Sequence, residues 1–192
     1  MYFVSSPDSK GTRNAENNTA SYKVLQSQKI IVGKDIDPGY YDIKALENES
    51  EFFGDKMHKN DVFHAVPFHM NGNIPLKGKI EFRPSKFEKA AKIGQKIILK
   101  EPGHYVVGTE IQAGNYVLSR TSDNIRVFVD IKDETETESL QTIQWEIDEK
   151  VKKPIEIELK KGYNVYIDKA GKDGYISNKG DLVLERNDED SE

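Results

Sequence analysis

The sequence predicts an all-β protein of two tandem antiparallel β-sandwich modules, jelly-roll-like, with one short helix in the first module. Apolar and polar residues alternate along many short segments, which indicates strands with one face in a core and the other in water. Turn residues separate these segments at close spacing, as in antiparallel sandwiches. An internal repeat in fixed register predicts that the sandwich occurs twice.

The predicted strands follow from this alternation, which is clearest in the second half of the chain. Segments 143–147 and 155–159 alternate strictly between apolar and polar residues. In segment 126–131 one face holds Val127, Val129 and Ile131, and in segment 163–167 one face holds Tyr163, Val165 and Ile167. Dipeptides typical of turns punctuate the chain, namely Pro38-Gly39, Asn71-Gly72, Pro102-Gly103, Asp173-Gly174 and Lys179-Gly180. This spacing predicts many short strands rather than a few long ones.

One segment has a helical pattern instead. Ser85 and Glu88 have the spacing of a capping box, in which each side chain bonds a backbone amide of the first turn. Apolar side chains then recur at helical spacing up to Gly94, a residue that suits the end of a helix. We therefore expect a helix over residues 86–93.

Composition excludes several classes of protein. The 192 residues carry 28 Lys and Arg against 33 Asp and Glu, a net charge of −5, and no Cys. The absence of Cys excludes disulfides, thiolate metal sites and Cys nucleophiles. The acidic balance argues against a nucleic-acid partner. No apolar run approaches the roughly 20 residues that span a bilayer.

The internal repeat places residues 30–43 over residues 105–118 with the pattern G-x-[DE]-I-x-x-G-x-Y. Its members are Gly33, Asp35, Ile36, Gly39 and Tyr41 in the first copy, and Gly108, Glu110, Ile111, Gly114 and Tyr116 in the second. We interpret it as a structural turn motif: glycines allow sharp backbone exits, the Ile enters the core and the Tyr opens the next strand. The acid is expected to bond turn amides, so no catalytic residue is predicted here.

The motif, with a closing strand at residues 157–165, resembles β-modules of poorly characterised secreted proteins and lipoproteins of Gram-positive bacteria. The resemblance covers residues 105–170 well and 29–104 less well. It implies an extracytoplasmic, cell-surface or secreted module, and it supplies no catalytic residues. The polar first 27 residues then suit a disordered tail or a stalk behind a removed N-terminal anchor, which would be the protein's only contact with a membrane.

These features predict four parts of the chain. Residues 1–27 are the tail, residues 28–104 form the first sandwich module, residues 105–185 form the second, and residues 186–192 form an acidic tail.

Two groups of residues are candidates for binding. His58, His64 and His69 lie close in sequence and could bind a metal or serve a hydrolytic site, although their spacing matches no metal motif. Residues 77–100 hold eight basic side chains against two acidic ones. Of these, Lys86, Lys89, Lys92 and Lys96 would lie on the predicted helix or near it and are candidates for binding an anion. The alternative is a solvated helix face and sheet edge, on which lysines prevent the pairing of edge strands.

We therefore expect a non-enzymatic, envelope-associated binding or structural module that needs no cofactor and no metal. Its partner would be an unknown protein, a glycan or an anionic envelope polymer. One alternative is a metal-binding or hydrolytic protein that uses the three histidines. Another is an interaction subunit of a surface or mobile-element assembly, with the charged faces as its interfaces.

Overall fold

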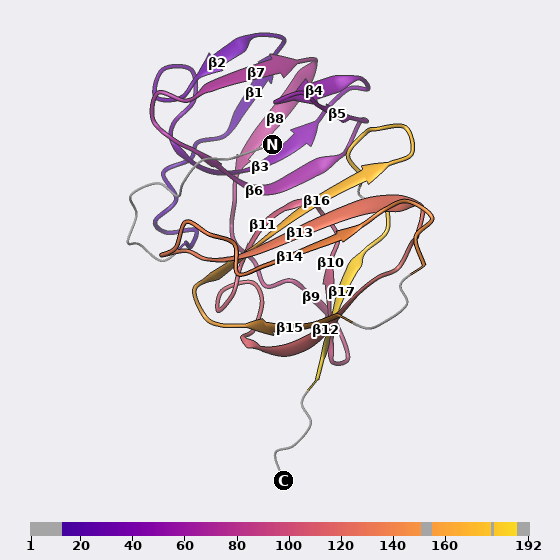
Figure 1. The fold of residues 1–192 in the computed structure, drawn as a ribbon. Helices are drawn as coiled ribbons and strands as arrows, with labels where there is room; N and C mark the ends of the chain where they lie inside the picture. The colour runs from indigo at the N-terminus through magenta and orange to yellow at the C-terminus, as the bar shows by residue number, and fades with distance from the viewer. Residues whose placement is uncertain (1–12, 151–154, 178, 188–192) are drawn as a thin grey trace. The chain divides into compact units, whose positions relative to one another are not determined.

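The computed structural model describes residues 13–150, 155–177 and 179–187 (Figure 1). Within these ranges every helix or strand element is a β-strand, so the all-β sandwich class is confirmed. None of the described residues forms a helix that could cross a membrane. The chain divides into two compact units, Met1–Phe87 and Glu88–Glu192.

The first unit has two sets of antiparallel strands. In one set the neighbours are, in order, β1 (Lys23–Gln26), β8 (Lys79–Pro84), β3 (Gly39–Ala45) and β6 (Val62–Phe68). In the other they are β2 (Lys29–Ile31), β7 (Asn73–Lys77), β4 (Ser50–Phe52) and β5 (Asp55–Met57).

Aromatic side chains join the two sets face to face. Phe52 of β4 packs against Phe68 of β6 and Phe82 of β8, with ring centroids 6.0 and 6.4 Å apart. Tyr41 of β3 packs on the same two rings at 4.9 and 6.2 Å. Aromatic pairs at these separations add to the energy of burial, so this cluster forms the centre of the first core.

The second unit repeats this arrangement. Its first set contains, in order, β11 (Gly103–Val106), β16 (Tyr163–Gly171), β13 (Ile125–Asp133) and β14 (Gln141–Trp145). Its second contains β15 (Ile155–Leu159), β12 (Gly114–Arg120), β17 (Leu182–Arg186), β10 (Lys96–Leu99) and β9 (Ala91–Ile93). A single apolar cluster fills the space between them, including Val129, Ile167 and Leu184.

The two units have the same topology. In the first unit the strand orders are β1-β8-β3-β6 and β2-β7-β4-β5. In the second unit they are β10-β17-β12-β15 and β11-β16-β13-β14. Counting β10 as the first strand of its unit gives the same two orders, 1-8-3-6 and 2-7-4-5. This is the order of an eight-stranded, two-sheet jelly roll. The second unit adds only β9, at the edge beside β10. The duplication therefore extends over the whole fold and not only over the sequence motif.

The predicted helix over residues 86–93 is wrong. Ala91–Ile93 form the edge strand β9, and residues 85–90 have no regular structure. Phe87 has a φ of 51°, outside the right-handed helical region. Its ring is buried and packs edge-on against Tyr40 with centroids 5.5 Å apart. Burial of this aromatic ring thus outweighs the capping-box preference.

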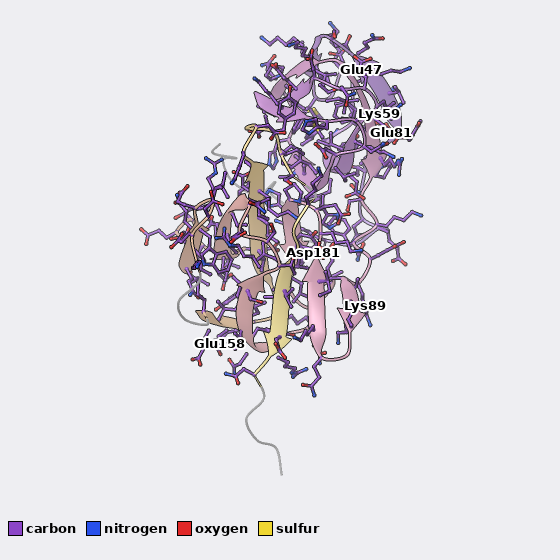
Figure 2. All side chains as sticks on the ribbon, turned by 90° about the vertical axis from the view of Figure 1, so that its right-hand side faces the viewer. Glu47, Lys59, Glu81, Lys89, Glu158 and Asp181 are labelled. Atoms are coloured by element: carbon purple, nitrogen blue, oxygen red, sulfur yellow. The ribbon has the colours of Figure 1, made fainter. Side chains whose placement is uncertain are left out.

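The predicted part boundaries also differ from the structure. The units divide at Phe87 and Glu88 rather than at residue 105, because β9 and β10 belong to the sheet that contains β17. Residues 13–27 are not a disordered tail: β1 pairs with β8, and the Tyr22 hydroxyl donates to Glu81, labelled in Figure 2, at 3.0 Å. At the other end Arg186 belongs to β17. Residues 1–12 and 188–192 of the predicted tails lie outside the described residues.

Candidate functional site

The repeated motif builds the same corner in both units. In the first, Val32 and Ile36 form a parallel bridge, and the Gly33 amide donates to the Ile36 carbonyl at 2.7 Å. In the second, Val107 and Ile111 form the bridge, and the Gly108 amide donates to Ile111 at 2.7 Å. Gly33 and Gly108 have φ values of 89° and 98°, which favour glycine. Both isoleucines are buried in their cores.

The acid of each motif bonds the strand before the corner. Asp35 Oδ2 accepts from the Ile31 amide at 2.8 Å, and Glu110 Oε2 accepts from the Val106 amide at 2.9 Å. Glu110 is only 4% exposed. Each carboxylate accepts a hydrogen bond from the amide four residues before it. Its role is therefore to stabilise the backbone of its own corner.

The tyrosine of each motif bonds back across the same corner. The Tyr41 hydroxyl donates to the Asp37 carbonyl at 2.8 Å, and the Tyr116 hydroxyl donates to the Gln112 carbonyl at 2.7 Å. The tyrosine corners of other β-sandwiches use a similar bond. Both rings are almost fully buried. The polar groups of the motif thus hold the frame of each jelly roll.

Replacing Glu110 by Ala should lower the free energy of unfolding of the second unit by about 1–3 kcal/mol, because the Val106 amide is buried and loses its acceptor. Glu110→Gln keeps an acceptor oxygen and should lose less. Trp145, the only Trp, lies in β14, so its fluorescence follows unfolding of this unit. Equal losses in the two variants would mean that the bond to Val106 does not support the corner.

The first unit covers the end of the sandwich at its corner with residues 18–21. The Asn18 amide nitrogen donates to the carbonyls of Tyr40 and Ser85 at 2.8 and 3.0 Å, and its oxygen accepts from the Tyr40 amide at 2.9 Å. The Thr19 hydroxyl donates to Pro38 at 2.6 Å. The Ser21 amide donates to the hydroxyl of Tyr41, the motif tyrosine, at 3.1 Å.

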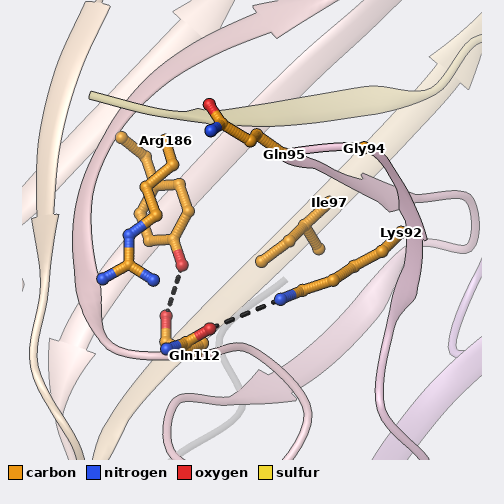
Figure 3. Close-up of a pocket in the computed structure, with 7 residues that line it drawn as sticks. Lys92, Gly94, Gln95, Ile97, Gln112 and Arg186 are labelled. Atoms are coloured by element: carbon orange, nitrogen blue, oxygen red, sulfur yellow. Dashed lines mark hydrogen bonds between the residues drawn. The ribbon is translucent and has the colours of Figure 1, made fainter. Parts of the chain in front are cut away.

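The second unit has a pocket of about 240 Å³ at the corresponding end (Figure 3). Its lining combines two cations, two amides, a tyrosine, an isoleucine and a glycine. These are Lys92, Arg186, Gln95, Gln112, Tyr116, Ile97 and Gly94. Tyr116 and Gln112 come from the repeated corner, so the pocket is built directly on the motif.

Strand register explains why both cations face the pocket. Lys92 of β9 lies opposite Ile97 of β10, and Arg186 of β17 lies opposite Tyr116 of β12. Directly opposite residues point to the same face of a sheet, and here that face is the inner one, where Ile97 and Tyr116 are buried. The Lys92 ammonium donates to Gln112 Oε1 at 3.3 Å.

The structure separates the four lysines that were predicted to bind an anion together. Lys86 lies in the first unit, and Lys89 is exposed on the irregular segment before β9 (Figure 2). Lys96 lies opposite Glu185 on the other face of the sheet and pairs with it at 3.2 Å. Only Lys92 lines the pocket.

Sequence reasoning missed Arg186 and Gln112. Gln112 lies inside the repeated motif, where the first copy has Asp37. Arg186 lies opposite Tyr116, whereas Pro84 lies opposite Tyr41. The alignment of the two copies already pairs Gln112 with Asp37, so this change of charge is visible in the sequence. Finding Arg186 required the register of β17 on β12.

The three histidines lie in separate surroundings. His64 Nδ1 lies 2.9 Å from Asp42 Oδ1, which also accepts from the Ala65 amide at 2.9 Å. Burial raises the pKa of Asp42, but the bonds and charge of His64 and the bond from Ala65 hold that pKa below its usual value. His58 Nδ1 lies 3.6 Å from Asp61.

His69 is half-buried. Its pKa is lowered mainly by burial and to a smaller extent by the positive charge of Arg13. Over residues 13–150, 155–177 and 179–187, no three His, Asp or Glu side chains are grouped as a metal site requires. The metal alternative therefore gains no support from the positions of His58, His64 and His69.

The fold and the site together define a tandem jelly-roll protein with a cationic pocket at one end of its second unit. Compared with known proteins, the chain matches no family model, no curated protein and no solved structure at a significant level. Its function is therefore inferred from its own residues and from the resemblance of its repeated motif to secreted β-modules.

Proposed function

We propose that this chain is a non-enzymatic binding module that is secreted or attached to the envelope of a Gram-positive bacterium. The observation that carries the proposal is the duplication of a complete jelly roll whose motif acids and tyrosines hold backbone corners in both copies. The motif acids are used for structure in both copies, which leaves ligand contact to other side chains around the corner.

The distribution of charge supports an anionic partner. The chain has a net charge of −5, yet the pocket of the second unit is lined by Lys92 and Arg186 and by no acid. A local cationic surface on an acidic protein favours a specific anionic ligand over general attraction to polyanions. The anionic polymers of an envelope provide such ligands at high density, and density compensates for weak individual contacts.

Co-sedimentation with isolated Gram-positive cell envelopes tests this function. The full chain is expected to sediment with intact envelopes and to remain in solution with envelopes from which the anionic polymers have been extracted. Mass spectrometry of the released material should show no new products during a long incubation. Failure to sediment would contradict the binding function, and product formation that scales with protein concentration would contradict the non-enzymatic one.

A further inference from the structure

We propose that the pocket at the end of the second unit binds one oxyanion group, a phosphate or a carboxylate, between Lys92 and Arg186. This inference rests on the proposed binding function and names the chemistry of its site. The first step is the charge of the lining: two of the seven lining residues are cations and none is an acid. Arg and Lys are the side chains that bind such groups most strongly.

The second step is the direction of the two cations. Lys92 and Arg186 both lie on the inner face of their sheet, opposite buried Ile97 and Tyr116. Figure 3 shows them entering the pocket from opposite sides, with Gln112 between their head groups in this view. Arg186 is partly buried and Lys92 is exposed, so a ligand can reach both head groups from solvent. An oxyanion between them would contact two cations at once and would therefore be held more strongly than by a single lysine.

The third step is the comparison of the two units. At the positions of Gln112 and Arg186 the first unit has Asp37 and Pro84. The same unit covers this end with residues 18–21, which bond Pro38, Tyr40 and Tyr41. At this end the second unit therefore has a pocket where the first has residues 18–21, Arg186 where the first has Pro84, and Gln112 where the first has Asp37. These three differences together fit a bound anion.

The fourth step is size. A pocket of about 240 Å³ is smaller than the roughly 300–1,000 Å³ that encloses a drug-sized ligand. It suits a single charged group, either free or as one unit of a longer polymer that continues into solvent. A phosphodiester polymer and a uronic acid polymer would present the same oxyanion chemistry to Lys92 and Arg186.

Titration of the full ¹⁵N-labelled chain, followed by NMR at constant ionic strength, tests the site. The probes are inorganic phosphate, glycerol 3-phosphate and glucuronate, with chloride as the reference. We expect saturable shifts of the Gln95 and Gln112 side-chain amides and of Arg186 Nε. Tighter binding of glycerol 3-phosphate would identify a phosphate source, and tighter binding of glucuronate a carboxylate source.

Two double variants with the same change of charge provide the comparison. Lys92→Gln with Arg186→Gln should weaken binding of the better probe at least about tenfold. Lys89→Gln with Lys96→Gln, outside the pocket, should change it less than about twofold. Unchanged amide spectra elsewhere in each variant show that the fold is retained.

The proposal is overturned if no probe shifts the lining residues saturably, or if the control variant weakens binding as much as the pocket variant. Failure of the pocket can be told from failure of the envelope function. Saturable shifts without co-sedimentation would support the oxyanion pocket and contradict the envelope function. Equal co-sedimentation of both double variants would support the envelope function and contradict the pocket as its binding site.

Discussion

Replacing Lys169 by Met should lower the free energy of unfolding of the second unit by about 3 kcal/mol or more. The Lys169 side chain is 0% exposed, and its ammonium donates to the carbonyls of Lys100 and, at 2.9 Å, Gly180. Hydrogen bonds to a charged group contribute about 1.5–3 kcal/mol each. Methionine keeps the apolar stem and removes both donors. Urea unfolding followed by the fluorescence of Trp145 measures the loss.

The stabilisation by Lys169 should also depend on pH. Burial lowers the pKa of Lys169 to about 8, against the opposing charges of Asp181 and Glu101, from an ordinary value of 10.5. Between these two values the unfolded chain holds the proton and the folded chain does not. The unfolded state then binds more protons, so the stability that depends on this residue rises with pH.

The difference in unfolding free energy between the native chain and Lys169→Met should therefore be constant below about pH 7 and increase from about pH 8 to pH 10. All other titrating groups are common to both proteins and cancel. A difference that stays flat across this range, or falls, would mean that the amine is not desolvated as the structure has it.

Replacing Gly39 by Ala should destabilise the first unit by about 2 kcal/mol more than Gly114→Ala destabilises the second. The two glycines are equivalent positions of the motif, with φ values of 146° and 158°. A Cβ on Gly39 would lie 2.6 Å from the Ala20 nitrogen and 2.7 Å from Asn18 Oδ1. On Gly114 the nearest atom would be Nη2 of Arg186, at 3.5 Å.

Each variant is a control for the other, because an alanine at either position has a similar cost in backbone strain. The two differ only in the atoms that the new Cβ would contact. Amide hydrogen exchange resolves the two units within one chain, and the loss of protection in Gly39→Ala should include Tyr40 and Ser21, whose amides bond this end. Equal losses in the two units would mean that residues 18–21 do not cover the first corner closely.

The fold class could be predicted because alternation of apolar residues depends only on local sequence and on the geometry of a strand. The duplication could be predicted from five motif positions in each copy, and the structure extends it to β1–β8 of the first unit and β10–β17 of the second. The prediction of a helix over residues 86–93 was wrong because Phe87 is buried against Tyr40, a contact between distant segments. The prediction of a disordered tail around Asn18 was wrong for the same reason, since Asn18 bonds residues 40 and 85.

The candidate site was predictable only in part. Lys92 was selected for the charge of its segment, but its position beside Ile97 depends on the register of β9 on β10. Arg186 was assigned to an acidic tail, whereas pairing with Tyr116 brings it to the inner face. Register between strands far apart in sequence cannot be obtained from alternation alone, since a shift of one residue reverses every side chain.

Native-state hydrogen exchange at equivalent amides is the most direct test of the claim that the two units have the same backbone frame. The amides of Ile31 and Val106 bond the motif acids, and those of Gly33 and Gly108 bond the motif isoleucines. All four should exchange far more slowly than in an unstructured peptide. Exchange at the unstructured rate for either member of a pair would show that one unit lacks the corner, and would contradict the duplicated frame.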